Sequence, residues 1–148
     1  MSSPFLSKGK KSALLKAARE ASKRAYAPYS KFKVGAALLT ERGGLFSGCN
    51  VENASYGLTV CAERSAVFQA VSQEGRNMRI RALAVVNENG KACVPCGACR
   101  QVIFEFGPDS AVLFQSTTGL EEMKASELLP KGFTGRKGAR TKSTNLKK

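Results

Sequence analysis

Residues 61–106 read CAERSAVFQAVSQEGRNMRIRALAVVNENGKACVPCGACRQVIFEF, and they hold most of the information about the architecture of this chain. The pattern predicts a helix from about Cys61 to Glu74, a buried strand from Ile80 to Val86 and a second helix from about Gly97 to Phe106. The pair Gly107-Pro108 ends the second helix, because proline cannot continue one. A helix, a strand and a helix in this order are typical of a layered α/β domain.

The flanking sequence extends the same alternation in both directions. Apolar residues at helical spacing predict an amphipathic helix from about Lys11 to Tyr26. Short apolar runs predict further strands over Phe32–Thr40, Leu45–Cys49 and Ala111–Gln115, with a fifth near Leu120–Lys124 and a short helix over Ser126–Leu129. Strands that alternate with helices predict a sheet lying between layers of helices.

Composition excludes several kinds of catalytic site. The 148 residues suffice for one domain, with 43% apolar and 24% charged residues. The sequence contains no histidine, which excludes Ser-His-Asp and Cys-His nucleophile sites and imidazole metal ligands. No apolar run approaches the roughly 20 residues of a membrane helix, and we expect no secretory signal.

The formal net charge of +13 is concentrated at the two ends. Residues 1–24 hold seven basic side chains and one acid, and residues 131–148 hold seven basic side chains and no acid. The stretch between them is neutral and gives no sign of a nucleic-acid surface. We therefore expect a domain of residues 11–133 between disordered basic segments at 1–10 and 134–148, which would bind polyanions weakly and with strong salt dependence.

Three of the five cysteines stand where two predicted helices begin. Cys61 starts one helix, and Cys96 and Cys99 lie at the start of the next. Helix N-termini favour thiolates, because the unpaired amides and the macrodipole stabilise negative charge. Three thiolates from neighbouring helix starts could hold a tetrahedral zinc ion with one open position. Glu63 would lie beside that position, where a carboxylate can take a proton from a bound water.

Less specific interpretations remain open at this point. Cys49 or Cys93 could complete a closed four-cysteine zinc site without catalytic function, although we expect both to be small core residues. A Cys-x-x-Cys pair alone would fit structural zinc, thiol chemistry or burial, whereas a thioredoxin-like redox pair would not require Cys61. An odd number of cysteines without a secretory signal argues for a reduced, cytoplasmic protein.

The order Cys61-Ala62-Glu63, then Pro95-Cys96-Gly97-Ala98-Cys99, resembles the zinc-dependent nucleoside deaminases, in the three-cysteine form of the small homotetrameric cytidine deaminases. Similar segments span about residues 12–133 and include Tyr29–Leu38, Asn50–Leu58, Cys96–Phe106 and Leu128–Phe133. The resemblance implies a three-layer α/β/α sandwich with a central mixed sheet of about five strands. It also implies one zinc ion per chain and a homotetramer with shared active sites.

The resemblance implies roles for the residues around the metal. Cys61, Cys96 and Cys99 would bind zinc, and Glu63 would be the proton shuttle. Arg64 would lie beside the thiolates. Zinc with three thiolates carries a net negative charge, and a guanidinium that donates to the sulfurs would draw part of that charge away.

The resemblance also implies a set of substrate contacts. Asn50 and Glu52 would hold the ribose hydroxyls, and Ala62 would contact the substrate. Phe32 and Phe133 would pack against the base or the sugar. Ala54 and Tyr56 would reach into the site of a neighbouring subunit.

These roles imply hydrolytic deamination of cytidine and 2′-deoxycytidine to uridine and 2′-deoxyuridine, a reaction of pyrimidine salvage. A blasticidin-type deaminase is the first alternative, and the intact Asn50-x-Glu52 pair, which suits an unmodified ribose, argues against it. A polynucleotide-editing deaminase is disfavoured because a buried contact to the 3′-hydroxyl leaves no room for the next phosphate. A structural zinc or RNA-binding module without turnover is the alternative outside the enzymes. We expect a free nucleoside as substrate and no membrane partner.

Overall fold

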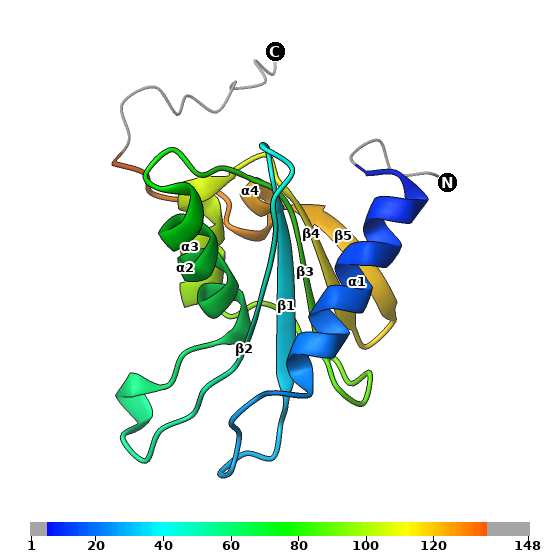
Figure 1. The fold of residues 1–148 in the computed structure, drawn as a ribbon, viewed down its shortest axis with the longest axis vertical. Coiled ribbons are helices and arrows are strands. Elements are labelled where there is room, and N and C mark those ends of the chain that lie inside the picture. The colour runs from blue at the N-terminus through cyan, green and yellow to red at the C-terminus, as the bar shows by residue number, and fades with distance from the viewer. Residues whose placement is uncertain (1–5, 136–148) are drawn as a thin grey trace, which may run out of the picture.

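The computed structural model describes residues 6–135. Ten elements follow one another along the chain: α1 (Lys8–Ser22), β1 (Val34–Thr40), β2 (Leu45–Cys49), the 3-10 helix η1 (Tyr56–Leu58), α2 (Ala62–Glu74), β3 (Ile80–Asn87), α3 (Gly97–Phe106), β4 (Ala111–Ser116), β5 (Gly119–Lys124) and α4 (Ala125–Leu128). Helix α1 covers one face of the sheet, and α2 and α3 cover the opposite face (Figure 1). The predicted three-layer α/β/α sandwich is confirmed. Within residues 6–135 no helix is long and apolar enough to cross a membrane.

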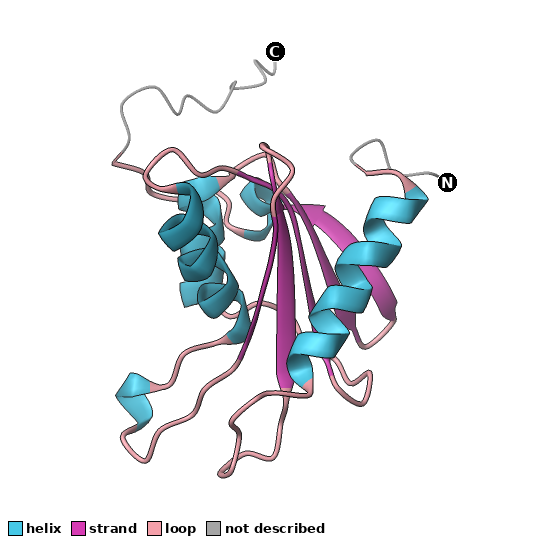
Figure 2. Ribbon diagram, viewed as in Figure 1, coloured by secondary structure: helices cyan, strands magenta, loops and turns pink. Residues whose placement is uncertain are grey.

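The five strands form one mixed sheet in the order β2-β1-β3-β4-β5, and the strands are drawn in magenta in Figure 2. Strands β3 and β4 pair in parallel, and every other pair of neighbours is antiparallel. A parallel pair needs a crossover connection, which α3 supplies here. The segment from the end of β3 to the start of α3 therefore leaves one end of the sheet and carries Cys93 and Cys96 with it.

Side chains of the central strands alternate between the two faces of the sheet, and the core therefore has two layers. On the α2 and α3 side, Leu83, Val85 and Phe114 belong to a cluster that includes branched and aromatic side chains. On the α1 side the strands contribute mostly small residues, Ala37, Ala82, Ala84 and Ala111 among them. Successive strand residues face opposite sides of a sheet, so this pattern places the larger volume on the face that also holds the cysteines.

The small residues allow α1 to lie close against the sheet. A Cβ atom added at Gly35 would stand 1.9 Å from the carbonyl oxygen of Ala18 and 2.4 Å from the backbone nitrogen of Ser22. Both are backbone atoms that cannot rotate away. The absence of a side chain at Gly35 therefore sets the distance between α1 and β1.

The limits of α1 differ from those predicted. The helix begins at Lys8 rather than near Lys11, because the Ser7 side chain accepts a hydrogen bond from the backbone nitrogen of Lys10 at 3.4 Å and caps it. It ends at Ser22 rather than near Tyr26. The backbone of Tyr26 instead bonds to the chain around Val51, donating to the Asn50 carbonyl at 3.0 Å. Residues 8–10, expected to be disordered, are thus helical, and most of the predicted basic tail lies outside the described residues.

The other limits are close to the prediction. Strand β1 begins at Val34 instead of Phe32, because the carbonyl groups of Phe32 and Lys33 accept hydrogen bonds from the Asn50 and Asn87 side chains. Strand β2 and helix α3 have the predicted limits. The remaining predicted elements agree within one residue at each end, whereas the 3-10 helix η1 was not predicted.

Candidate active site

Three cysteine sulfurs gather where α2 and α3 begin. Cys61 and Cys96 are the N-cap residues of these two helices, both with extended backbone, and Cys99 lies in the first turn of α3. The Sγ atoms of Cys61, Cys96 and Cys99 all lie within 4.8 Å of one another. The two helices pack side by side, so their positive N-terminal ends face the same cluster of sulfurs.

The geometry of the cluster fits a zinc ion. Four ligands at zinc–sulfur distances of 2.3 Å in a tetrahedron require sulfurs about 3.8 Å apart, and the Sγ atoms of Cys61 and Cys96 are 3.9 Å apart. Neither Cys49 nor Cys93 joins the group of candidate ligands among residues 6–135. Three thiols and no fourth protein ligand are the donor set of an open site, in which one metal position remains for water or substrate.

Arg64 neutralises part of the thiolate charge. Its guanidinium Nη2 donates to the Sγ of Cys61 at 3.3 Å, from one helical turn further along α2. A hydrogen bond from the Cys99 thiol, with a further contribution from Arg64, lowers the pKa of Cys61 to about 5 against the effect of burial. The same bond to Cys61 raises the pKa of Cys99 above its usual range, and the bond to Cys61 also raises the pKa of Arg64. In the metal-free cluster, the hydrogen bond between Cys61 and Cys99 thus favours the thiolate on Cys61.

Glu63 is the one buried carboxyl group beside the sulfurs among the described residues. It lies in the first turn of α2, and only 4% of its surface is exposed. Burial, with a smaller contribution from the adjacent Cys61, raises the pKa of Glu63 to about 7. A carboxyl group with a pKa close to neutral can both accept and donate a proton under physiological conditions.

A pocket of about 280 Å³ opens beside the sulfurs. Cys61, Ala62, Glu63 and Cys96 line it together with Phe32 and Asn50, so six of the residues expected to meet metal or substrate share one cavity. Five further lining residues were not predicted: Ser30, Val34, Thr59, Cys93 and Val94. Thr59 and Val94 each stand two residues before one of the clustered cysteines, and this spacing in the sequence could have predicted them. Cys93, expected in the core, packs partly against the core and partly lines the pocket.

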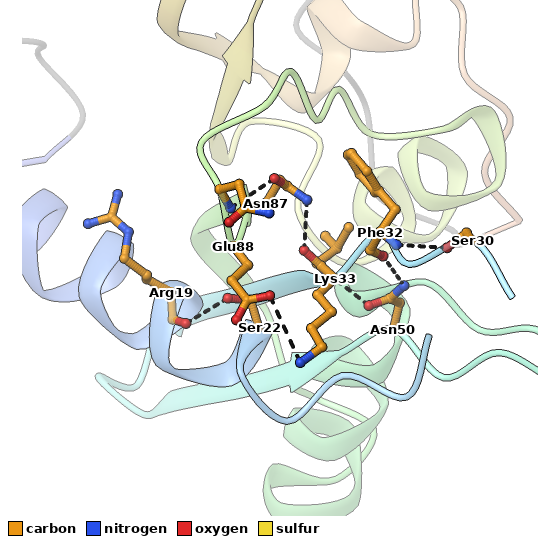
Figure 3. A network of polar contacts seen from close by, with 10 residues as sticks. Arg19, Ser22, Ser30, Phe32, Lys33, Asn50, Asn87 and Glu88 are labelled. Atoms are coloured by element: carbon orange, nitrogen blue, oxygen red, sulfur yellow. Dashed lines mark hydrogen bonds and ion pairs between the residues drawn. The ribbon is translucent and has the colours of Figure 1, made fainter. Parts of the chain in front are cut away.

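The Asn50 side chain is engaged by the backbone of its own chain. Its Nδ2 donates to the Phe32 carbonyl at 2.9 Å, and its Oδ1 accepts from the Val34 N–H at 2.9 Å (Figure 3). An asparagine amide offers two N–H groups and two lone pairs, so one of each remains for a ligand. Asn50 therefore holds the segment that carries the Phe32 ring as well as lining the pocket.

Glu52 lies outside the lining of the pocket. One carboxylate oxygen accepts hydrogen bonds from the backbone N–H groups of Tyr29 at 3.0 Å and Ser30 at 3.1 Å. A hydrogen bond from the Ser30 side chain is the largest cause of the lowered pKa of Glu52. The carboxylate thus stabilises the turn that precedes Phe32.

Three other predicted substrate contacts also lie outside the pocket. Ala54 is exposed, Tyr56 is 82% exposed and Phe133 is 77% exposed. Ala54 and Tyr56 belong to a loop that projects away from the sheet between β2 and α2 (Figure 1). Within one chain these side chains do not meet the pocket.

Comparisons with known proteins agree with this geometry. Residues 8–115 match the family described as the cytidine and deoxycytidylate deaminase zinc-binding region. A cytidine deaminase of Halalkalibacterium halodurans is 50% identical over 123 residues, which cover 82% of this chain and 92% of that protein. A blasticidin-S deaminase of Bacillus cereus is 33% identical over 112 residues, covering 71% of this chain and 79% of that protein. The crystal structure of a cytidine deaminase from Burkholderia pseudomallei superposes with a TM-score of 0.75 at 47% identity, covering 86% of this chain and 100% of that chain.

Proposed function

The chain belongs to the cytidine and deoxycytidylate deaminase family, and from this premise we propose that it hydrolyses cytidine and 2′-deoxycytidine to uridine and 2′-deoxyuridine in pyrimidine salvage. The observation that carries the proposal is the buried carboxyl group of Glu63 in the same pocket as the sulfurs of Cys61 and Cys96. A buried acid beside a metal site provides the proton transfers that removal of an amine requires.

Cys61, Cys96 and Cys99 are the residues that would hold one zinc ion per chain. Bound there, zinc supplies a Lewis acid that makes water a nucleophile at neutral pH. Arg64 lowers the negative charge of the thiolates through its bond to Cys61, and so preserves the acidity of the site.

Glu63 would carry the protons between water and substrate. Its carboxylate takes a proton from the attacking water and delivers it to N3 of the cytosine ring. It next takes the proton of the hydroxyl group that the attack leaves on C4 and passes this proton to the amine, so that the C4–N bond breaks, ammonia leaves and the C4 carbonyl of uridine remains. One group can serve in these transfers because they follow one another.

The substrate contacts remain proposals for each residue. Phe32 and Ala62 line the pocket and suit the flat base, and Asn50 has one N–H and one lone pair left for a ribose hydroxyl. Glu52 has one carboxylate oxygen engaged by the turn at Tyr29 and Ser30, and the other would reach the ribose.

In a homotetramer, the predicted substrate contacts that lie outside the pocket of their own chain would reach the pocket of another chain. Ala54, Tyr56 and Phe133 are exposed and lie away from the pocket of their own chain. We propose that they complete the pocket of a neighbouring subunit and exclude water from it. Light scattering should then give the mass of four chains, and Tyr56→Ser should lower kcat/KM for cytidine although the residue does not line the pocket of its own chain. A fully active monomer would contradict this part of the proposal.

A reducing compartment suits the site. All five cysteines are free thiols, and three of them must remain reduced to hold a metal. We therefore propose a cytoplasmic location.

Three substrates test the proposed function directly. Purified zinc-loaded protein is incubated with cytidine, 2′-deoxycytidine or blasticidin S, and ammonia release is measured. Turnover of the two free nucleosides with little turnover of blasticidin S supports the proposal. Turnover of blasticidin S alone would favour the second family activity, and no turnover of any of the three would favour a structural zinc module.

A further inference from the structure

The side chain of Asn87, the last residue of β3, forms hydrogen bonds in two directions. Its Oδ1 accepts from the backbone N–H groups of Asn89 at 2.9 Å and Lys91 at 3.3 Å. Its Nδ2 donates to the carbonyl oxygen of Lys33 at 2.9 Å (Figure 3). Since only 2% of Asn87 is exposed, water cannot replace these bonds.

The hydrogen bonds of Asn87 reach two segments of the chain, and each segment leads to residues that form a wall of the pocket. Lys33 lies between Phe32 and Val34, which line one wall. Asn89 and Lys91 form the turn from which the chain continues to Cys93, Val94 and Cys96 in the other wall. A single buried amide thus joins the segments that carry both walls.

Among the described residues, the other connections between these segments are the strand ladder, one ion pair and one backbone hydrogen bond. The ladder between β1 and β3 ends at the pair Val34 and Asn87, so it does not include Phe32 or Lys33. The ion pair between Lys33 and Glu88 is long at 3.9 Å and partly exposed, and such pairs contribute little. The backbone N–H of Glu88 also donates to the Lys33 carbonyl at 3.0 Å. Loss of the Asn87 donor would therefore loosen the Phe32 segment without releasing it.

We propose that Asn87 is a positioning residue of the nucleoside pocket. It holds the Phe32 segment at a set distance from the Cys93–Cys96 segment and thereby sets the width available to the base. Asn87 does not itself line the pocket, so it acts through Phe32, on which Asn50 acts from the other side. The inference rests on the proposed function and adds to it a residue that determines how tightly the substrate fits.

Asn87→Ser should remove the hydrogen bond to Lys33 and keep a hydrogen bond to the turn at Asn89. A serine hydroxyl can still accept from the Asn89 N–H, as serine does in turns, but it is too short to reach the Lys33 carbonyl. We expect KM for cytidine to rise roughly fivefold, the loss typical of one hydrogen bond, while kcat and zinc content stay near those of the wild type. Asn89→Ser is the matched control, because that side chain is exposed and only its backbone N–H contacts Asn87. It should leave KM unchanged.

Asn87→Asp provides a second, isosteric test. A carboxylate keeps both acceptor bonds of the turn but presents no donor to Lys33, so KM should rise again. Amide hydrogen exchange followed by NMR gives a readout that does not depend on turnover. In both variants the Val34 N–H should exchange faster, because Val34 lies on the loosened segment and its hydrogen bond to Asn50 is weakened, while the Asn89 N–H stays protected.

The two hypotheses fail in different ways. If the wild type is active but neither substitution changes KM or the exchange rate of the Val34 N–H, the role of Asn87 is overturned. A fall in zinc content and kcat with unchanged KM would also overturn it, since that result indicates a general structural role. A wild type that does not turn over cytidine would refute the proposed function, and the exchange rates would still decide whether Asn87 holds the Phe32 segment.

Discussion

The guanidinium of Arg64 donates to the Sγ of Cys61 at 3.3 Å, and both residues belong to the first turn at the start of α2. A helix places residues three apart on one face, so the charge that compensates the thiolate is built into the same helix as the thiolate. The Nε of Arg64 is buried without a hydrogen-bond partner among the described residues. The guanidinium is thus held in the site mainly by its bond to sulfur.

Arg64→Gln should weaken metal binding and turnover more than folding. A glutamine can donate a hydrogen bond to sulfur but carries no charge, and the loss of a group that supports a metal ligand typically costs about 10–100-fold in affinity or activity. Competition with a zinc chelator and kcat for cytidine are the measurements. Arg24→Gln, at an exposed position after α1, is the control and should change neither. Wild-type zinc affinity in Arg64→Gln would contradict this role.

Zinc should be present at one ion per chain, with three sulfur ligands and one light atom. Elemental analysis gives the amount, and X-ray absorption gives the number of sulfurs. Cys99→Ala should remove most of the zinc, because Cys99 is one of the three clustered thiols. Cys49→Ala and Cys93→Ala should keep it. A spectrum with four sulfurs would show that the site is closed.

Glu63→Gln should retain zinc and fold but lose turnover. The amide has nearly the same shape as the carboxyl group but cannot carry a proton between water and the base. Proton transfer by a positioned group is typically worth about 10²–10⁴-fold, so kcat should fall by at least that range. Near-normal kcat in a zinc-loaded variant would remove Glu63 from the mechanism.

In the metal-free protein, the free energy of unfolding should depend on pH because Glu63 ionises. Burial raises the pKa of Glu63 from 4.5 to about 7, so the folded state binds this proton more tightly than the unfolded chain does. The stabilising contribution is therefore complete below pH 4.5 and is lost as the pH rises through 7. The loss corresponds to roughly 3 kcal/mol in the free energy of unfolding.

Urea unfolding of the metal-free wild type and of metal-free Glu63→Gln isolates this contribution. The thiols titrate in both proteins, so the difference between the two free energies of unfolding reports Glu63. That difference should fall with rising pH between 4.5 and 7 and then level off. A difference that does not depend on pH would show that Glu63 keeps an ordinary pKa.

Gly35→Ala should destabilise the fold by about 1–3 kcal/mol or more, the cost of adding an atom to a packed core. The new Cβ would meet the backbone of Ala18 in α1, and the helix would have to move. Gly9→Ala is the matched control, because nothing lies within 4 Å of a Cβ at that helical position. Alanine there should stabilise by about 0.5–1 kcal/mol. Thermal or urea unfolding measures both changes, and equal stability of Gly35→Ala and wild type would contradict the close packing.

The sequence by itself determined the succession of helices and strands and the three cysteines that stand where α2 and α3 begin. These features depend on local rules: periodicity separates helix from strand, and Gly107-Pro108 stops α3. The three sulfurs and Glu63 could be predicted because each stands within the first turn of its helix or at its cap. Two such helix starts need only lie side by side to bring the sulfurs together.

Only the tertiary structure decided how the remaining polar side chains are used. The local pattern marks Asn50 and Glu52 as polar residues in a loop, but their partners are the backbone of residues 29–34, which are about 20 positions away. The same holds for Asn87, whose partner Lys33 is 54 positions distant, and for the sheet order that places β1 between β2 and β3. Long-range contacts of this kind depend on how the layers pack, because a buried amide or carboxylate bonds to whichever backbone groups packing brings against it.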